Sequence, residues 1–407
     1  MSIHSRLAFV IKWPVDMLPP MTYPTRNIAV LGATGSIGQS TIEVIEASEG
    51  RLNVIGISGH SQTEKLCQAA QRVQPDMVVV TDPARASSID AGMLPNGCQL
   101  LSGEDQVISL VQHEQVDIVV AAIVGFAGLR STWAALERGK TVALANKETL
   151  VVGGPLVMKL ANDNAARIIP VDSEHSAIFQ ALQGSEASQV KRIILTASGG
   201  PFLHRTQDQL DAVTVDEALA HPTWQMGPKI TVDSATMMNK ALEIIEARWL
   251  FDIPVEKIDV VIHPQSIVHS LVEFEDGSVL AQLSPPDMKL PIQYALSYPD
   301  RWPSPSRKLD LTEAFSFDFL PADIENFPAI ALGMEVAGQG GTAGAVFNAA
   351  NETAVAHFLD GQLQFKRIVP ACRAILEHHD FDLNPSLEQL TQLDAWARKE
   401  TIQWIGA

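Results

Sequence analysis

The stretch that decides the fold is the apolar run Asn27-Ile28-Ala29-Val30-Leu31, followed by Gly32-Ala33-Thr34-Gly35-Ser36-Ile37-Gly38. The run has strand length, and the apolar residues over 36–47 recur with helical spacing, so the glycines occupy a strand-turn-helix. Small residues in such a turn let the backbone approach a pyrophosphate, whose charge faces the free N–H groups of the helix. The spacing is GxxGxxG rather than GxGxxG. It predicts a dinucleotide site, with a purely structural turn as the alternative.

Further apolar runs of strand length follow, separated by helical stretches. They cover residues 52–57, 77–81, 117–123, 141–145 and 167–171. Near-continuous hydrophobicity within each run is typical of parallel strands that are covered on both faces. We therefore expect an α/β fold in which residues 25–171 form a doubly wound, Rossmann-like dinucleotide-binding domain.

The pattern changes after residue 171. Strand-like runs at 192–196, 257–262, 266–274 and 278–282 surround one helix, from about residue 234 to 250, and Asp276-Gly277 is typical of a tight hairpin. Prolines between 285 and 305 indicate an irregular connection, and helical patterns begin at about 329. We expect a central α+β catalytic and dimerisation domain at 172–297, a linker at 298–323 and a C-terminal helical bundle at 324–407.

Residues 1–24 match neither a strand-helix pattern nor a secretory signal, because no long apolar segment follows a charged start. We expect a disordered leader. A short presequence and an upstream start codon before Met21 are the alternatives.

The composition excludes two classes of partner. The 47 acidic and 29 basic side chains give a formal charge of -18, and such a field repels nucleic acid. The longest apolar run, 118–129, is shorter than the roughly 20 residues that a membrane span requires. Three widely spaced cysteines have neither disulfide nor metal-ligand spacing, which favours a cytoplasmic protein with reduced thiols.

The end of the second predicted strand indicates which dinucleotide binds. NAD enzymes usually place an acid there, which would repel a 2′-phosphate. This chain has Gly59, His60 and Ser61 instead. Serine and histidine donors suit a 2′-phosphate, so NADP(H) is favoured over NAD(H).

A metal site is indicated by Asp172 and Glu174, which directly follow the run 167–171. If strand geometry continued there, residues two apart would point to one side and both carboxylates could bind one cation. Hard oxygen ligands suit Mg²⁺ or Mn²⁺. A helix cap is the alternative.

The predicted helix that begins near residues 233–234 strengthens the metal hypothesis. Those two residues have the chemistry of an N-cap, and Asn239, Lys240 and Glu243 share a face of the helix. Lysine and asparagine near hydroxyls suit a terminal phosphate, and Glu243 could be a third carboxylate ligand. Glu246, one turn further, is expected to be an ordinary helix-face acid that pairs with water or an arginine.

Two irregular segments could complete a site. The loop 196–201 is rich in glycine and includes Ser198, which predicts an oxyanion or phosphate cradle. The segment 221–228 combines an imidazole, an indole and a thioether and is too broken to be helical. We interpret it as a lid over a site.

In this order, the motifs resemble the 1-deoxy-D-xylulose 5-phosphate reductoisomerase family. The likeness runs from about residue 25 to the C-terminus and depends on segments 32–38, 145–148, 170–175, 198–202, 232–248 and 263–266. It implies an enzyme of the non-mevalonate isoprenoid route. Such an enzyme rearranges a small phosphorylated sugar, by retro-aldol cleavage or by migration, and reduces the product with NADPH to 2-C-methyl-D-erythritol 4-phosphate. The resemblance also implies a homodimer.

The resemblance, together with the residues above, gives a set of expected site residues. The metal ligands would be Asp172, Glu174 and Glu243, with Mg²⁺ or Mn²⁺ expected and Co²⁺ as a further candidate. The catalytic set is Lys147, Asp172, Glu174, His175, His221, Trp224, Glu243 and His269. Substrate contacts are Lys147, Ser173, Glu174, Ser198, His221, Ser234, Asn239, Lys240 and Glu243, with Ser198, Ser234, Asn239 and Lys240 toward the phosphate. Cofactor contacts are Thr34, Gly35, Ser36, Ile37, Gly59, His60, Ser61, Asn146, Glu148, Met226 and Gly227. His60 and Ser61 depart from the family pattern, in which Lys or Arg followed by Asn is common.

Two other functions are alternatives. An NADP-dependent semialdehyde or alcohol dehydrogenase that performs no rearrangement would not need three carboxylates together. A dinucleotide-binding sensor or scaffold would have no reason to keep Lys240 and Glu243 beside Asn239.

Overall fold

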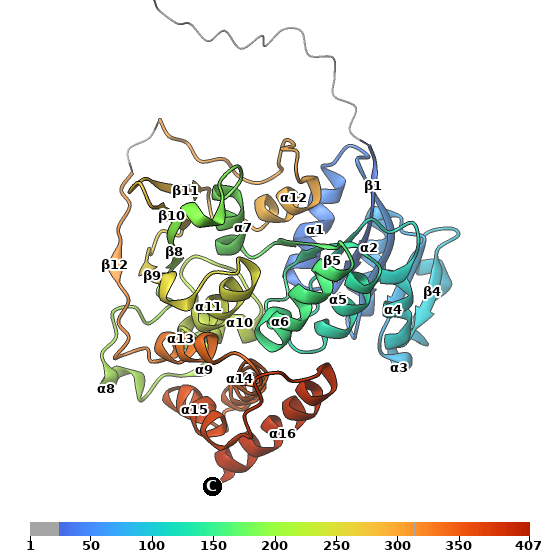
Figure 1. The fold of residues 1–407 in the computed structure, drawn as a ribbon. Coiled ribbons are helices and arrows are strands. Elements are labelled where there is room, and N and C mark those ends of the chain that lie inside the picture. Colours follow the sequence, from blue (N-terminus) through green and yellow to red (C-terminus); the bar gives the residue numbers. More distant parts are fainter. Residues whose placement is uncertain (1–23, 313–314) are drawn as a thin grey trace, which may run out of the picture.

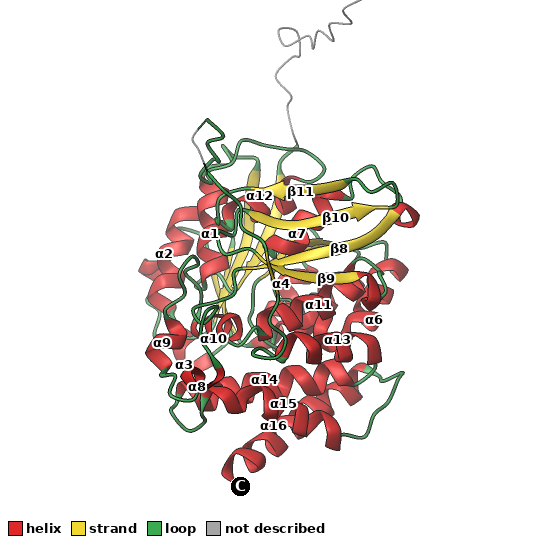
Figure 2. Ribbon diagram, turned by 90° about the vertical axis from the view of Figure 1, so that its left-hand side faces the viewer, coloured by secondary structure: helices red, strands yellow, loops and turns green. Residues whose placement is uncertain are grey.

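The computed structural model describes residues 24–312 and 315–407. The leader predicted at 1–24, with its alternatives, lies outside the described residues except for Pro24. Two sheets lie on either side of a central group of helices, and a helical bundle at the C-terminal end packs beneath them (Figures 1 and 2).

The first sheet is parallel throughout and has the strand order β4-β3-β2-β1-β5-β6-β7. Strands β2, β3 and β4 lie on one side of β1, and the later strands β5, β6 and β7 lie on its other side. This reversal creates a switch point at the carboxyl ends of β1 and β5, where open α/β sheets bind ligands. The doubly wound prediction is confirmed. The strands are β1 (Arg26–Leu31), β2 (Leu52–Gly59), β3 (Met77–Val80), β4 (Gln99–Ser102), β5 (Ile118–Ala121), β6 (Thr141–Leu144) and β7 (Arg167–Pro170). The helices between them are α1 (Ser36–Glu46), α2 (Thr63–Val73), α3 (Pro83–Ala86), α4 (Glu104–Gln112), α5 (Gly128–Glu137) and α6 (Glu148–Asp163).

Strand β4 was not predicted. It forms the edge of the parallel sheet and only its two central residues are half-buried, so it lacks the continuous apolar run of β1 or β5. An edge strand of this kind gives almost no hydrophobic signal.

The second sheet is mixed and has the order β11-β10-β8-β9-β12. Strands β10 and β11 form an antiparallel hairpin whose turn contains Gly277 at φ 84°, as the Asp276-Gly277 pair predicted. The α+β prediction is confirmed. The strands are β8 (Val190–Ala197), β9 (Ile258–Ile262), β10 (Val268–Phe274), β11 (Val279–Leu283) and β12 (Leu320–Pro321). Helix α7 (Ser173–Ala181) packs on β10 and β11, and α12 (Lys289–Ser297) packs on α1. Short helices α8 (Gln207–Leu210) and α9 (Val215–Leu219) precede the segment 221–227.

The helix predicted from about residue 234 to 250 is wrong at its start. Helix α10 covers Pro228–Ala235, and α11 covers Met238–Leu250. Met237 lies between them at φ 61°, in the left-handed region, and ends the helical path. Asp233 and Ser234 are therefore in the last turn of α10 and are not N-caps. The apolar pattern hid the break because both helices are largely buried.

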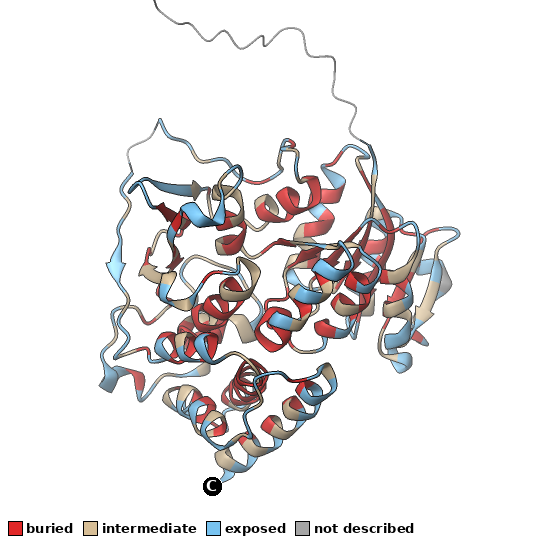
Figure 3. Cartoon of the chain, in the orientation of Figure 1, coloured by how far each residue is buried: buried red, intermediate tan, exposed pale blue. Residues whose placement is uncertain are grey.

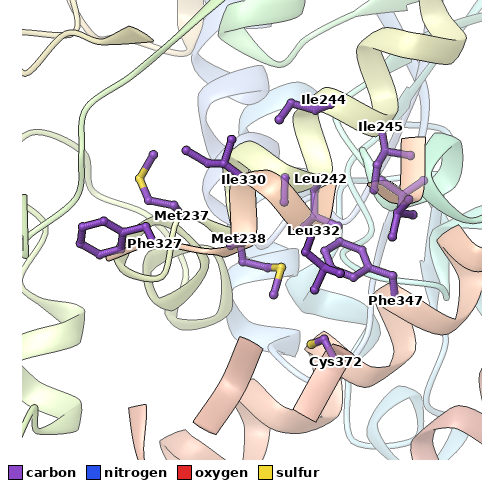
Figure 4. Close-up of a cluster of buried hydrophobic side chains, with 14 of the residues drawn as sticks. Met237, Met238, Leu242, Ile244, Ile245, Phe327, Ile330, Leu332, Phe347 and Cys372 are labelled. Atoms are coloured by element: carbon purple, nitrogen blue, oxygen red, sulfur yellow. The ribbon is translucent and has the colours of Figure 1, made fainter. Parts of the chain in front are cut away.

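A large buried cluster joins α11 to the C-terminal helices (Figure 4). Met238 and Leu242 of α11 belong to the same cluster as Leu332 of α13 and Phe347 of α14. A Cβ atom on Gly333 would lie 2.6 Å from the Cα atom of Ala241, so α11 and α13 touch almost backbone to backbone. Figure 3 shows α14 buried along nearly its whole length. The predicted bundle consists of α13 (Ala329–Gln339), α14 (Ala343–Leu359), α15 (Ile368–His378) and α16 (Leu387–Gly406).

None of the described helices combines the length and apolarity that a membrane crossing demands. Cys67 and Cys372 are buried free thiols, and Cys98 is a half-buried one.

Candidate active site

A cavity of about 550 Å³ lies where the parallel sheet, the mixed sheet and helices α7, α10 and α11 meet. The segment 221–226 forms part of its wall. The expected site residues that line it are Ser36, Ile37, Lys147, Asp172, Ser173, Glu174, Ser198, His221, Trp224, Met226, Ser234, Asn239, Lys240, Glu243 and His269. The structure therefore brings together residues that are more than 200 positions apart in the chain.

The carboxylates of Asp172, Glu174 and Glu243 converge in this cavity, although not by continued strand geometry. The chain turns into α7 directly after Asp172, so the expectation of an extended Asp172-Ser173-Glu174 segment is wrong. Asp172 occupies the N-cap position, but its side chain makes no capping hydrogen bond. Glu243 comes from α11. One oxygen of each carboxylate lies within 4.8 Å of the other two.

Two buried lysines provide the counter-charge for these acids. The Nζ atom of Lys147 lies 2.5 Å from Asp172 Oδ2 and 3.3 Å from Glu243 Oε1. Lys240 lies 2.9 Å from Glu174 Oε1 and also pairs with Glu243. Burial alone would lower the pKa of Lys147, but Asp172 and Glu243 raise it well above its usual value. Burial would also lower the pKa of Lys240, but Glu174 and Glu243 raise it. Both ammonium groups are therefore charged, yet three carboxylates share two cations.

The donor set fits a divalent cation. Burial, followed by repulsion from Glu174, raises the pKa of Glu243, so further positive charge would stabilise its ionised form. Burial would likewise raise the pKa of Asp172, but Lys147 and His175 hold it well below its usual range. Three hard oxygen donors, two at the start of α7 and one on α11, match the ligand preference of Mg²⁺ or Mn²⁺.

The glycine loop after β8 lies at another part of the cavity. Ser198 Oγ accepts a hydrogen bond of 3.2 Å from the Gly200 N–H. A Cβ atom on Gly200 would come within 2.7 Å of the Ser234 carbonyl oxygen, so the loop and α10 approach closely. Asn239 accepts from Lys147 at 2.8 Å and donates to Glu243 at 2.5 Å. Asn239 and Lys240 thus contact the carboxylate cluster as well as the cavity.

His221 holds the beginning of the segment 221–227. Its Nδ1 accepts from the backbone N–H groups of Thr223 and Trp224, at 3.1 and 2.9 Å. Burial lowers the pKa of His221, which favours the neutral ring. The proton therefore lies on Nε2, which donates to Ser198 Oγ at 3.1 Å.

His269 of β10 is buried in the wall of the cavity. Its Nε2 donates to the Ser284 carbonyl oxygen at 3.1 Å, and burial lowers its pKa. Its ring centroid lies 6.3 Å from that of Trp224. His269 therefore links the mixed sheet to the same segment.

His175 and Glu246 form a buried pair behind the cavity. His175 Nε2 donates to the Glu243 carbonyl oxygen at 3.0 Å, and its Nδ1 lies 3.3 Å from Glu246 Oε2. The prediction of a solvated Glu246 is wrong, because α11 is packed against α6, α10 and α13 and this side chain is fully buried. Burial raises the pKa of Glu246 to about 7. Burial would lower the pKa of His175, but Glu246 and Asp172 raise it to about 9.

Most of the expected cofactor residues follow the carboxyl ends of strands in the parallel sheet. They are the loop 34–37 after β1, residues 59–61 at the end of β2, and Asn146 and Glu148 after β6, whereas Met226 and Gly227 directly precede α10. His60 Nδ1 lies 2.8 Å from Thr81 Oγ1, and no acidic side chain occurs at 59–61. The expected residues that do not line the central cavity are Thr34, Gly35, Gly59, His60, Ser61, Asn146, Glu148, His175 and Gly227.

Several residues near the site were not predicted, and Arg307 and Lys229 are two charged examples. Arg307, from the expected linker, lines the cavity. Lys229 lies directly after the segment 221–227 and pairs with Glu148 and Asp233, at 3.1 and 2.8 Å. The four-residue spacing from Lys229 to Asp233 on a helix was the available signal for this pair.

The glycine-rich turn at the switch point of a doubly wound sheet and the buried carboxylate cluster beside it define a class. It is the class of dinucleotide-binding oxidoreductases with a site suited to a divalent cation. The family model of 1-deoxy-D-xylulose 5-phosphate reductoisomerase matches residues 28–154. Two family models of the C-terminal domain of this enzyme match residues 168–251 and 283–400. The chain belongs to the 1-deoxy-D-xylulose 5-phosphate reductoisomerase family.

Individual relatives agree with this assignment. The reductoisomerase of Rhodopirellula baltica is 50% identical over an alignment of 427 positions, which covers 92% of this chain and 94% of that protein. The reductoisomerase of Heliobacterium modesticaldum is 47% identical, with 94% and 98% covered. A crystal structure of the reductoisomerase in complex with NADPH, fosmidomycin and magnesium has a TM-score of 0.88 and 42% identity, and covers 94% of this chain and 98% of that one. The Zymomonas mobilis enzyme in complex with NADPH has a TM-score of 0.87 and 42% identity, with 94% and 99% covered.

Proposed function

We propose that this protein converts 1-deoxy-D-xylulose 5-phosphate to 2-C-methyl-D-erythritol 4-phosphate, with NADPH and a divalent cation, in the non-mevalonate isoprenoid pathway. The observation that carries the proposal is the convergence of Asp172, Glu174 and Glu243 in one cavity beside the glycine-rich turn. A dehydrogenase that performs no rearrangement has no use for three converging acids at this place, so that alternative is not favoured.

The carboxylates of Asp172, Glu174 and Glu243 would hold Mg²⁺ or Mn²⁺, with Co²⁺ as a further candidate. A cation there supplies Lewis-acid polarisation of a substrate carbonyl and its neighbouring hydroxyl. Lys147 and Lys240 offset the remaining charge and fix the positions of the acids through their ion pairs. Because the cluster is buried, these interactions act in a low effective dielectric and are stronger than they would be in water.

The substrate phosphate would be bound by Ser198, Ser234, Asn239 and Lys240, with Ser173 nearby in the cavity wall. His221 can donate a proton from Nε2, the atom that now contacts Ser198. The segment that carries Trp224 and Met226 would exclude water from the cavity when substrate is bound.

NADPH would lie across the carboxyl ends of β1, β2 and β6 and supply the hydride. The loop 34–37 places the N-terminus of α1 at the pyrophosphate. Residues 59–61, which include no acid, would accept the 2′-phosphate. Asn146, Glu148, Met226 and Gly227 complete the expected set of cofactor contacts.

We further propose that the protein is a cytoplasmic homodimer. Each chain would consist of an NADPH-binding domain at 25–171, a catalytic and dimerisation domain at 172–297, a linker at 298–323 and a C-terminal helical domain at 324–407. Strand β11 supports the dimer: it is an edge strand, and its Val279, Leu280 and Leu283 are exposed. Exposed apolar edges of sheets are usually covered by a partner.

Chelation should abolish turnover. With deoxyxylulose phosphate and Mg²⁺ or Mn²⁺ present, NADPH absorbance should fall steadily, and excess EDTA should stop the reaction until the cation is restored. The reason is that truncating the electrophilic contribution to a reaction commonly costs at least about a hundredfold in rate. Oxidation of NADPH that continues at an unchanged rate in EDTA would favour the simple dehydrogenase.

His60→Arg should tighten NADPH binding about fivefold, because a guanidinium binds a phosphate with two charge-assisted hydrogen bonds. The measurement is the Michaelis constant for NADPH, with NADH as the matched control because it has no 2′-phosphate. An unchanged constant for NADPH would show that His60 does not face the 2′-phosphate.

A further inference from the structure

Lys229 connects the end of the segment 221–227 to the wall that bears Asn146 and Glu148. It is the second residue of α10, after the N-cap Gly227 and Pro228. Its Nζ atom lies 3.1 Å from Glu148 Oε1 and 2.8 Å from Asp233 Oδ2, and only 19% of its side chain is exposed. Burial would lower the pKa of Lys229, but Asp233, Glu148 and Glu352 raise it above its usual value. The lysine is therefore a charged group held among three acids.

The orientation of two proposed cofactor contacts depends on this pair. The second carboxylate oxygen of Glu148 accepts from Asn146 Nδ2 at 3.0 Å. The same amide donates to the Gly125 carbonyl oxygen at 3.0 Å, and Asn146 Oδ1 accepts from the Thr149 N–H at 3.0 Å. With Lys229 removed, Glu148 would lose its ammonium partner and the network would lose the group that balances its charge.

The C-terminal bundle supports the lysine from the other side. Asp233 Oδ1 accepts from Asn351 Nδ2 of α14 at 2.9 Å, and both side chains are buried. The next residue, Glu352, pairs with Arg398 of α16 at 2.6 Å. A Cβ atom on Gly125 would lie 2.7 Å from Glu352 Oε1, so this acid also packs on the loop after β5. Helix α6, helix α10 and the bundle thus meet near one ammonium group.

We propose that Lys229 is a positioning residue that couples NADPH binding to the placement of the segment 221–227. It acts through Glu148 on the cofactor wall and through Asp233 and Asn351 on the bundle. NADPH that binds against Asn146 and Glu148 stabilises the ion pair between Glu148 and Lys229. Because Lys229 directly follows the segment 221–227, this ion pair fixes the end of the segment that carries Trp224. The bundle contributes none of the expected site residues. It influences the reaction through the contact of Asn351 with Asp233.

The test compares Lys229→Gln with Lys229→Arg and with Lys159→Gln. Lys159 lies on α6, like Glu148, but forms an exposed ion pair with Asp163 and is the matched control. We expect Lys229→Gln to raise the NADPH dissociation constant at least about tenfold, since breaking one partner of a buried charge pair is costly. Lys229→Arg should restore most of the affinity, and Lys159→Gln should behave as wild type. In turnover, Lys229→Gln should raise KM for NADPH more than it lowers kcat.

A second readout separates positioning from general destabilisation. NADPH should slow chymotryptic cleavage after Trp224 in the wild type and in Lys159→Gln, and should fail to slow it in Lys229→Gln. Retained protection together with a dissociation constant within twofold of the control would overturn the proposal. If Lys229→Gln does not fold, Asn351→Ala is the second test, because it removes the contact to Asp233 without changing the charge of the protein. We expect weaker NADPH binding in Asn351→Ala, and an NADPH dissociation constant equal to that of the control would overturn the proposal.

The proposal rests on the proposed function only for its place in the reaction. Binding and proteolysis are measured without deoxyxylulose phosphate and without added metal. A protein that fails to turn over the sugar but shows coupled NADPH protection would contradict the proposed function and leave the role of Lys229 intact.

Discussion

Glu243→Gln should give a folded protein that binds NADPH nearly as well as the wild type and turns over at least about a hundredfold more slowly, as expected when one charged group that stabilises a transition state is removed. The glutamine keeps the shape of the side chain but removes one of three negative charges from the cluster. Asp172 and Glu174 would then share a divalent cation with a neutral amide. Steady-state rates at saturating substrate and cation, together with direct metal titration, measure the effect.

The fold should survive this change because Glu243 is not a stabilising ion when no cation is bound. Burial and repulsion from Glu174 already disfavour its charged form, so the neutral amide removes a cost at the same time as it removes an attraction to Lys240. Glu335→Gln is the control, since that exposed acid on α13 lies far from the cluster in the sequence, pairs with Arg373 at the surface and accepts a hydrogen bond from Gln339. A rate near that of the wild type would exclude Glu243 from the site.

Gly38→Ala should abolish tight NADPH binding, raising the dissociation constant at least about a hundredfold and lowering the melting temperature, because overpacking against backbone costs about 1–3 kcal/mol or more. An added Cβ would lie 2.4 Å from the Gly32 carbonyl oxygen and 2.5 Å from the Ala33 Cα atom. These are backbone atoms of the loop itself, so α1 would have to move away from the turn. The N-terminus of α1, which we propose faces the pyrophosphate, would move with it.

Fluorescence titration with NADPH and a thermal melt measure the two effects of Gly38→Ala. Gly338→Ala is the matched control: it adds the same methyl group to α13, where the nearest atom is 3.6 Å away. Near-normal affinity in Gly38→Ala would mean that the turn does not hold the dinucleotide.

The parallel sheet could be predicted from sequence because burial on both faces leaves an uninterrupted apolar run, as in β1 and β5. The glycine turn could be predicted because the close approach of Gly38 to residues 32–33 lies within seven residues of sequence. Edge strand β4 and the break at Met237 could not, since exposure erases the first signal and burial on both sides of the break erases the second.

The candidate site shows the same division. Asp172, Glu174 and Glu243 were recognised by their chemistry and by resemblance, although the local geometry inferred for the first two was wrong. Glu246 was misjudged because a helical pattern does not reveal whether a polar position faces solvent or another helix. Lys229 was missed because its partner Glu148 is 81 residues away and belongs to another layer of the fold.

The near-contact of Gly333 with Ala241 has a consequence for how natural sequence variation should be interpreted. Ala241 lies between Lys240 and Leu242 on α11, two positions before Glu243. Any side chain at 333 would act as a wedge that tilts α11 and carries Glu243 away from the acids of α7. A natural substitution of Gly333 should therefore be classified with substitutions in the catalytic centre, although Gly333 lies on α13, which contributes no expected site residue.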